Sequence, residues 1–169
     1  MSKKHLRMCE IALYESKKST ITFQHGAVIT KGNKIIFKGH NHERSLVKGK
    51  LTYCLHSEMV VVNDWLKMCC KNISDPNIIK RKGKKFTIYI TRNNNDNTNN
   101  NFSFSKPCFM CTQLLKKCNF KRIIYTTGDN NIFRVVKPSH LDDGVLTSVD
   151  KQNLKNIQMF RQINNLIHC

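Results

Sequence analysis

Two short motifs, each at the start of a predicted helix, constrain this chain most strongly. His56-Ser57-Glu58 begins one helix, and Pro107-Cys108-Phe109-Met110-Cys111 begins another. An imidazole and two thiolates are typical zinc ligands, and three protein ligands leave the fourth tetrahedral position open for water. Only Cys108 and Cys111, among eight cysteines, have ligand spacing. If the motifs act together, the fold must bring the N-termini of two distant helices to one point.

Glu58 is the predicted proton-transfer group of this site. It lies two residues beyond His56 on the first helical turn, about 200° around the helix axis, so it need not bind the same ion. A carboxylate beside a metal-bound water can accept that water's proton. The positive ends of both helix dipoles would also favour the thiolates. The motifs therefore predict His56, Cys108 and Cys111 as metal ligands and Glu58 as the catalytic residue.

Hydrophobic spacing predicts the surrounding elements. Apolar side chains at helical spacing predict helices over residues 3–18 and 55–69. Two β-rich runs, 24–30 and 34–40, flank a Gly-Asn turn and predict an antiparallel hairpin. Residues 41–50, rich in His, Arg and Gly, are expected to form a loop, as is the basic run 80–85. Further patterns predict strands at 86–91, 123–125 and 132–136, the last being a strand or a loop, and helices at 108–118 and 154–167.

Strands and helices alternate after the hairpin, which favours a mixed sheet because parallel neighbours need a crossover connection. The sequence therefore predicts an α/β fold, a three-layer α/β/α sandwich on a mixed sheet of about five strands. A length of 169 residues is typical of one domain. We expect a single domain over residues 1–169 with a basic and Asn-rich insertion at residues 72–104.

The charge balance indicates a class of partner. With 29 Lys and Arg against 11 Asp and Glu, the formal net charge is +18, which favours phosphate-bearing partners such as RNA or single-stranded DNA. AT-rich coding also enriches lysine, so codon bias is an equally good explanation. No apolar run is long enough to span a bilayer or to act as a signal peptide. These observations predict an intracellular, cytoplasmic protein without membrane contact.

The pattern H-x-E followed by P-C-x-x-C resembles the cytidine and deoxycytidylate deaminase superfamily, the zinc-dependent nucleobase deaminases. The likeness extends to the hairpin with His25-Gly26-Ala27 and Gly39-His40-Asn41, and to the run 121–125 after the cysteine helix. It implies a cytidine-deaminase-like fold and one zinc per chain, bound by His56, Cys108 and Cys111. It also implies that Glu58 carries protons and that Asn41 holds the nucleoside.

Four residues are candidates for contacts with the substrate. The resemblance implies that backbone groups of Ser57 and Cys108 contact the base; many relatives have Ala where this chain has Ser57. Arg44 follows Asn41 by three residues in a loop expected at the pocket rim. We include Asn41, Arg44, Ser57 and Cys108 as substrate-binding candidates.

The resemblance implies hydrolytic deamination, the cleavage of a C–N bond of a cyclic amidine. The first hypothesis is a cytosine base in a nucleoside or nucleotide such as deoxycytidylate, converted to the keto base with release of ammonia. The second is cytosine or adenine in RNA or single-stranded DNA, as in tRNA adenosine deaminases. The third is a non-catalytic, zinc-stabilised binding module. Relatives commonly form oligomers, so we expect a homo-oligomer.

Overall fold

The structure is a computed structural model that describes residues 2–47, 50–69, 75–94, 102–129, 132–145, 147 and 151, without the side chains of residues 44–53. Its main sheet contains β1 (His25–Lys31), β2 (Lys34–His40), β5 (Thr87–Asn93), β6 (Phe102–Ser103), β7 (Arg122–Thr126) and β8 (Phe133–Val136). Its helices are α1 (Lys3–Ser16), α2 (Ser57–Cys69), α3 (Pro76–Gly83) and α4 (Phe109–Cys118), with a short 3-10 turn at Pro138–His140. The predicted helix 154–167 lies outside the described residues.

The main sheet is mixed, as predicted. Its strand order is β2-β1-β5-β7-β8, with the short β6 paired to β5. Strands β5 and β7 are parallel, because α4 connects them as a crossover, and the other neighbours are antiparallel. Within residues 72–104 the structure places α3, β5 and β6, so the middle strand of the sheet lies in this range.

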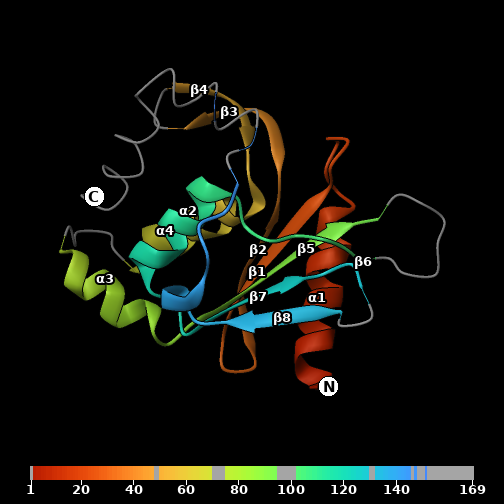
Figure 1. Ribbon diagram of the computed structural model, residues 1–169. Helices are drawn as coiled ribbons and strands as arrows, with labels where there is room; N and C mark the ends of the chain where they lie inside the picture. The colour runs from red at the N-terminus through yellow and green to blue at the C-terminus, as the bar shows by residue number, and fades with distance from the viewer. Residues whose placement is uncertain are drawn as a thin grey trace.

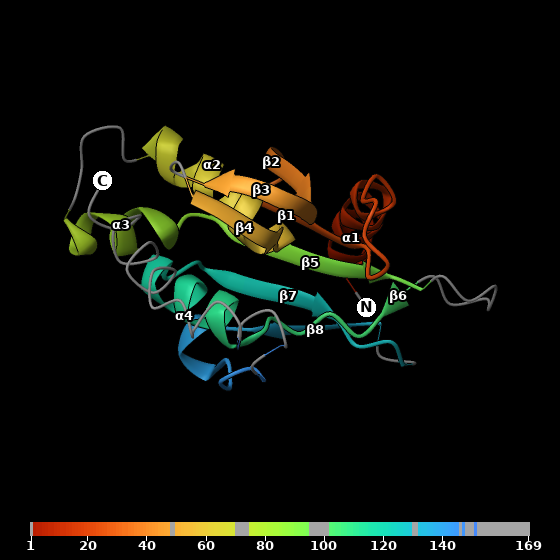
Figure 2. The ribbon, with the colours of Figure 1, turned by 90° about the horizontal axis from the view of Figure 1, so that it is seen from above.

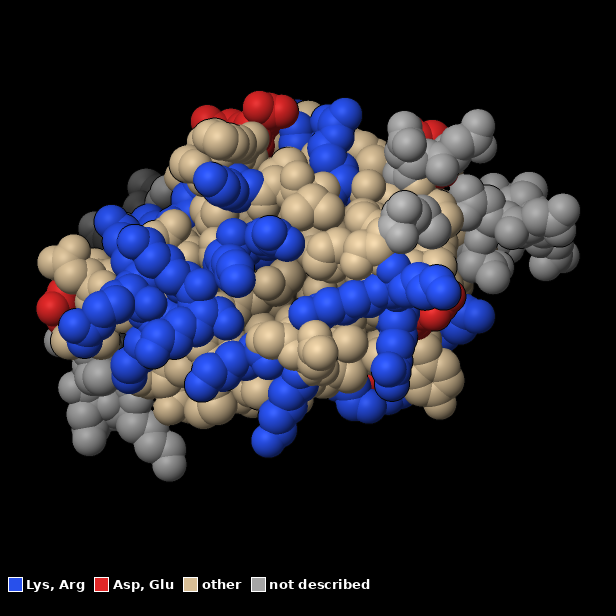
Figure 3. Space-filling view, turned by 90° about the horizontal axis from the view of Figure 1, so that it is seen from below, with Lys and Arg blue, Asp and Glu red and all other residues tan. Residues whose placement is uncertain are grey.

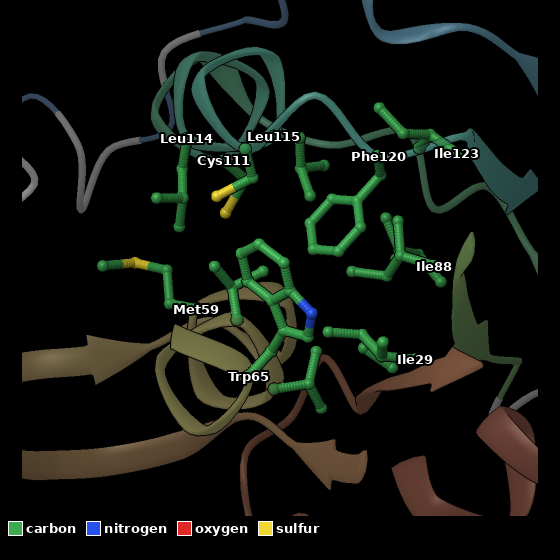
Figure 4. Packing of buried hydrophobic residues seen from close by; sticks show 14 of the residues in the cluster. Ile29, Met59, Trp65, Ile88, Cys111, Leu114, Leu115, Phe120 and Ile123 are labelled. Atoms are coloured by element: carbon green, nitrogen blue, oxygen red, sulfur yellow. The ribbon is translucent and has the colours of Figure 1, made fainter. Parts of the chain in front are cut away.

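Alternating side chains of the strands build a core on each face of the sheet. Ala27 and Ile29 of β1 point to the face covered by α2, α3 and α4, and Val28 points to the face covered by α1. Figure 2 shows α1 and α4 on opposite sides of the sheet. The three-layer α/β/α prediction is therefore confirmed. On the α2 and α4 side, Trp65 is fully buried and packs against Phe120 (Figure 4).

Two expected loops contain regular structure instead. Residues 41–50 were predicted as a loop, but β3 (His42–Val47) and β4 (Lys50–Leu55) form a separate antiparallel hairpin beside the main sheet (Figure 1). The basic run 80–85 was also predicted as a loop, but most of it belongs to α3. Asp75 caps this helix by accepting a hydrogen bond from the Asn77 amide at 2.8 Å, and Pro76 occupies its first turn. In the described part of the chain, no helix has the length and apolar character needed to cross a bilayer.

Candidate metal centre and active site

The N-termini of α2 and α4 meet, as the two motifs require. His56 directly precedes α2, Cys108 is the N-cap residue of α4, and Cys111 lies on the first turn of α4. The Nδ1 atom of His56 lies 3.3 Å from the Cys108 Sγ and 3.4 Å from the Cys111 Sγ. All three ligand atoms lie within 4.8 Å of one another. The fold therefore brings the three predicted ligands to one point.

This spacing fits a tetrahedral zinc ion. Zn–S and Zn–N bonds at tetrahedral angles separate sulfur from nitrogen by about 3.6 Å, close to the observed distances. A hydrogen bond with Cys111, helped by His56, lowers the pKa of the Cys108 thiol to about 6 against the opposing effect of burial. The site thus favours the thiolate that a metal needs. One zinc per chain is the cofactor that this donor set fits.

A cavity of about 390 Å³ opens beside the three ligands. Its wall is built from the start of β1 and the segment before it, the end of β2, β4, and the starts of α2 and α4. The lining residues are Ile21, Phe23, His25, Asn41, Cys54, His56, Glu58, Lys106, Cys108 and Thr147. The predicted ligands His56 and Cys108 therefore share one hollow with Glu58 and Asn41, and the third ligand, Cys111, is buried behind them.

Glu58 lines the cavity from the first turn of α2 and is 4% exposed. Its Oε2 accepts a hydrogen bond of 3.0 Å from the hydroxyl of Ser57, which is fully buried. A buried carboxylate needs such partners because isolated charge in a low-dielectric site is costly. Ser57 therefore contributes more than its backbone: its side chain holds the carboxylate of its neighbour.

Asn41 fixes the opposite wall of the cavity. Its Oδ1 accepts a hydrogen bond from the His25 amide at 2.9 Å, and its Nδ2 donates one to the Phe23 carbonyl at 2.7 Å. Its own carbonyl accepts from the Ser19 hydroxyl at 2.9 Å. Asn41 thus holds together the segment before β1, the start of β1 and the end of β2. Of the other substrate-binding candidates, Arg44 lies in β3, and its side chain is outside the described part.

The sequence reasoning assigned no role to several lining residues. His25, at the start of β1, is an example: burial lowers the pKa of its ring to about 4, partly opposed by the Glu58 carboxylate, so the imidazole is neutral at pH 7. Its role could have been inferred from the sequence, because His25 begins the predicted hairpin that ends at the candidate substrate-binding residue Asn41. Cys54 and Lys106 each lie two residues before a predicted metal ligand, and that closeness was their signal; Phe23 carries none, because only the tertiary fold brings it to the cavity.

A strap after β8 returns to the metal centre; we use this name for residues 141–145. Its Asp142 forms an ion pair of 3.5 Å with Lys106, and its Asp143 forms one of 2.8 Å with Lys116 on α4. The Phe109 amide at the start of α4 donates to the Val145 carbonyl at 3.3 Å. A Cβ at Gly144 would clash with the Pro107 carbonyl, so the strap can lie against Pro107 only because this residue is glycine.

Comparison with known proteins identifies a family and similar folds. The family model for the cytidine and deoxycytidylate deaminase zinc-binding region matches residues 2–127. A crystal structure of cytidine deaminase from Burkholderia pseudomallei superposes with a TM-score of 0.54 at 18% identity, covering 85% of this chain and 99% of that one. The apo dCMP deaminase from cyanophage S-TIM5 gives 0.49 at 18%, covering 78% and 90%. The same enzyme with dCMP and dUMP gives 0.48 at 17%, covering 75% and 84%. No protein with a curated description matches significantly.

An α/β sandwich with a His/Cys/Cys site at two helix N-termini defines a zinc-binding deaminase fold. The family match covers most of the chain and includes both motifs. This chain belongs to the cytidine and deoxycytidylate deaminase family.

Proposed function

We propose that this protein is a zinc-dependent hydrolytic deaminase that acts on cytosine in a free nucleoside or nucleotide such as deoxycytidylate. One observation carries the proposal: a three-ligand site with a fourth position to fill opens into the same cavity as the buried carboxylate of Glu58. A structural zinc site is normally closed by four protein ligands and needs no such carboxylate. The arrangement therefore favours catalysis over a zinc-stabilised binding module.

Glu58 moves the protons in the proposed reaction. A zinc ion held by His56, Cys108 and Cys111 would supply Lewis acidity that lowers the pKa of water at the fourth position. The Glu58 carboxylate accepts one proton from the attacking water and delivers it to the ring nitrogen beside the reacting carbon. It then transfers the second proton to the amino group, which leaves as ammonia. The water oxygen stays on the ring as the keto oxygen.

Other lining residues orient the substrate in this proposal. Asn41, whose amide already bonds the backbone on both sides, keeps one N–H and one lone pair for a sugar hydroxyl. Backbone groups of Ser57 and Cys108 face the base. Lys106 is the cation among the described lining residues, and its counterion Asp142 is exposed to solvent. A 5′-phosphate near Lys106 would form a charge-assisted contact, which favours a nucleotide monophosphate.

The test is deamination by the zinc-loaded chain of cytidine, deoxycytidine, their monophosphates and adenosine, followed by ammonia release and ultraviolet absorbance. We expect turnover of at least one cytosine compound and a loss of about 10²–10⁴-fold in Glu58→Ala, the usual contribution of a general acid–base group. Glu43→Ala, which removes an exposed carboxylate of β3, is the matched control. Activity confined to adenosine would contradict the cytosine proposal, and zinc binding with no turnover would favour the binding module.

Three further expectations stay predictions. These are a homo-oligomer, a cytoplasmic location, and one domain over residues 1–169 with an insertion at 72–104. The oligomer is measured by light scattering of the zinc-loaded chain.

A further inference from the structure

One end of the main sheet, formed by strand termini on the side away from the cavity, carries a continuous row of exposed cations. Each of the five long strands contributes a basic residue there, either at its terminus or within three residues of that terminus along the chain. We call this set the basic row; it consists of Lys31, Lys34, Lys84, Lys85, Lys121, Arg122 and Lys137.

The strand register places these residues side by side. Lys31, which ends β1, pairs with Lys34, which begins β2. Thr87 of β5 pairs with Thr30 of β1 on one side and with Arg122 of β7 on the other. Ile123 of β7 pairs with Val136 of the antiparallel β8. The next residue along the chain, Lys137, therefore lies beside Arg122 at the same end of the sheet. Neighbouring strands lie about 4.8 Å apart, so the row extends over roughly 19 Å.

The positive charge of the row is not neutralised within the described part of the chain. The ion pairs there involve Glu15, Asp64, Asp142 and Asp143, and none includes a residue of the basic row. The strand termini and turns that form this end of the sheet contain no Asp or Glu. Two exposed cations of α3, Lys80 and Arg81, extend the surface. Figure 3 shows the resulting face, on which blue side chains gather and red ones are few.

Codon bias alone does not account for this distribution. It would enrich lysine at all exposed positions alike, and elsewhere several acidic residues form ion pairs with lysines. Lys18 and Lys38, for example, both lie within 4.0 Å of the Glu15 carboxylate, at 2.8 and 3.9 Å. The cations of the basic row lie together at one end of the sheet, and none of them forms an ion pair with a described acidic residue.

We propose that the basic row binds nucleic acid through its phosphate backbone. A nucleic-acid strand carries one negative charge at every phosphate, so a row of about 19 Å can contact several phosphates at once. Exposed lysines give sequence-independent contacts of this kind. A lipid surface fits less well, because membrane binding also needs apolar side chains that insert. Here the apolar neighbours Phe86 and Ile123 are buried in the core.

The surface is a docking site and does not present a base to the catalytic cavity. Strand β1 runs from His25, which lines the cavity, to Lys31 in the row. Six residue steps of about 3.3 Å separate these ends by roughly 20 Å. A bound strand along the row would therefore leave the cavity open to free nucleotides, and the inference does not depend on the proposed reaction.

The test compares two variants with the same net charge. Lys31→Gln, Lys34→Gln and Arg122→Gln together remove three charges from the basic row, and Lys18→Gln, Lys38→Gln and Lys67→Gln remove three exposed lysines elsewhere. Fluorescence anisotropy with a mixed-sequence single-stranded DNA of roughly 20 nucleotides measures the affinity of each full-length, zinc-loaded protein between 50 and 200 mM salt. Circular dichroism and thermal melting confirm that both variants fold.

We expect wild-type affinity to fall steeply with salt and the row variant to bind at least about tenfold more weakly at the lower salt concentration. The slope of log affinity against log salt should fall by about 2, since three phosphate contacts each contribute about 0.7 on a single strand. The control triple variant should keep most of the affinity. Equal weakening of both variants, or an affinity that stays flat with salt, would overturn the proposal.

Two further measurements separate this inference from its competitors. Binding to phosphatidylserine vesicles that depends on the row, together with DNA binding that does not, would assign the surface to lipid and contradict the proposal. Deamination of free nucleotides should be unchanged in the row variant, and Glu58→Ala should retain wild-type DNA affinity. Absence of deaminase activity would therefore not contradict nucleic-acid binding by the basic row. Absence of DNA binding would not contradict the proposed deaminase activity.

Discussion

The two ends of the main sheet are formed by the same strands but differ in how their polar side chains interact. At the cavity end, the polar groups of the candidate site have specific partners: Asn41 bonds the backbone on both sides, and Ser57 bonds Glu58. At the opposite end, the cations of the basic row are exposed and have no ion-pair partner among the described residues. One end depends on exact geometry, and the other depends on summed charge.

This difference predicts how each end responds to substitution. Buried groups in a hydrogen-bonded network lose function one residue at a time, because removing one partner leaves another unsatisfied. Exposed charges act roughly additively at a distance, so one substitution removes only a fraction of the effect. Substitutions at the two ends therefore test this contrast.

Removal of a metal ligand should have the largest effect. Cys108→Ala is expected to lose bound zinc and all measurable deaminase activity, because two ligands hold the ion too weakly. Metal analysis by mass spectrometry and the nucleotide assay measure both losses. Cys118→Ala, in the last turn of the same helix, should keep one zinc per chain. Full zinc occupancy in the Cys108 variant would mean that the proposed ligand set is wrong.

Loss of the Asn41 amide should lower stability as well as activity. Asn41→Ala removes two side-chain hydrogen bonds and leaves the His25 amide and the Phe23 carbonyl without them. We expect the free energy of unfolding to fall by about 2 kcal/mol, measured by urea denaturation. Asn77→Ala, at an exposed position of α3, is the control. An unchanged unfolding midpoint would show that the cavity wall does not depend on this residue.

Neutralising Lys106 should affect substrate choice and leave the chemistry intact. Lys106→Met is expected to raise KM for deoxycytidylate about tenfold, which is the value of one charge-assisted contact of about 1.4 kcal/mol, and to leave kcat and KM for deoxycytidine nearly unchanged. Steady-state kinetics on the two substrates supply the comparison. Equal changes for both would exclude a phosphate contact.

The Ser57 hydroxyl should contribute a smaller amount to catalysis. Ser57→Ala removes the hydrogen bond to the Glu58 carboxylate, and we expect kcat to fall about fivefold, as for the loss of a hydrogen bond of about 1 kcal/mol. KM and zinc content should stay the same. Ser57→Thr, which keeps the hydroxyl, tests for rescue if its methyl group can be accommodated. A wild-type kcat in the alanine variant would show that only the backbone of Ser57 is used.

A single substitution in the basic row should have the smallest effect. Lys137→Gln is expected to weaken DNA binding less than about threefold and to reduce the salt slope by about 0.7. Anisotropy at several salt concentrations measures both. A loss as large as that of the triple row variant would mean that this end of the sheet also contains a specific site, and the contrast between the two ends would fail.

Most of the main sheet and the metal ligands could be predicted from the sequence, because both depend on local patterns. A continuous apolar run marks β1, alternating residues mark β5, and the motif spacing predicted His56, Cys108 and Cys111 as one cluster. The β3–β4 hairpin was missed because its polar first strand, with Glu43 and Arg44, lacks the alternation expected of a half-buried strand.

Other features depend on tertiary contacts that local patterns do not record. Helix α3 is short and mostly basic, and within it only Ile79 and Gly83 are buried, so its hydrophobic signal is weak although the Asp75-Pro76 start was visible. The cavity wall was predictable only where the motifs contribute to it. Phe23 and Thr147 reach it from segments far from both motifs.

The strap lies beyond residue 127, where the family match ends, yet it is pinned to the beginning of the helix that carries two of the ligands. Thr147, just after it, forms part of the cavity wall. Substitutions in this late stretch can therefore alter one part of the cavity wall without replacing His56, Cys108 or Cys111. Gly144 sets the limit of that freedom, since a side chain there would clash with the Pro107 carbonyl and displace the stretch from the start of α4.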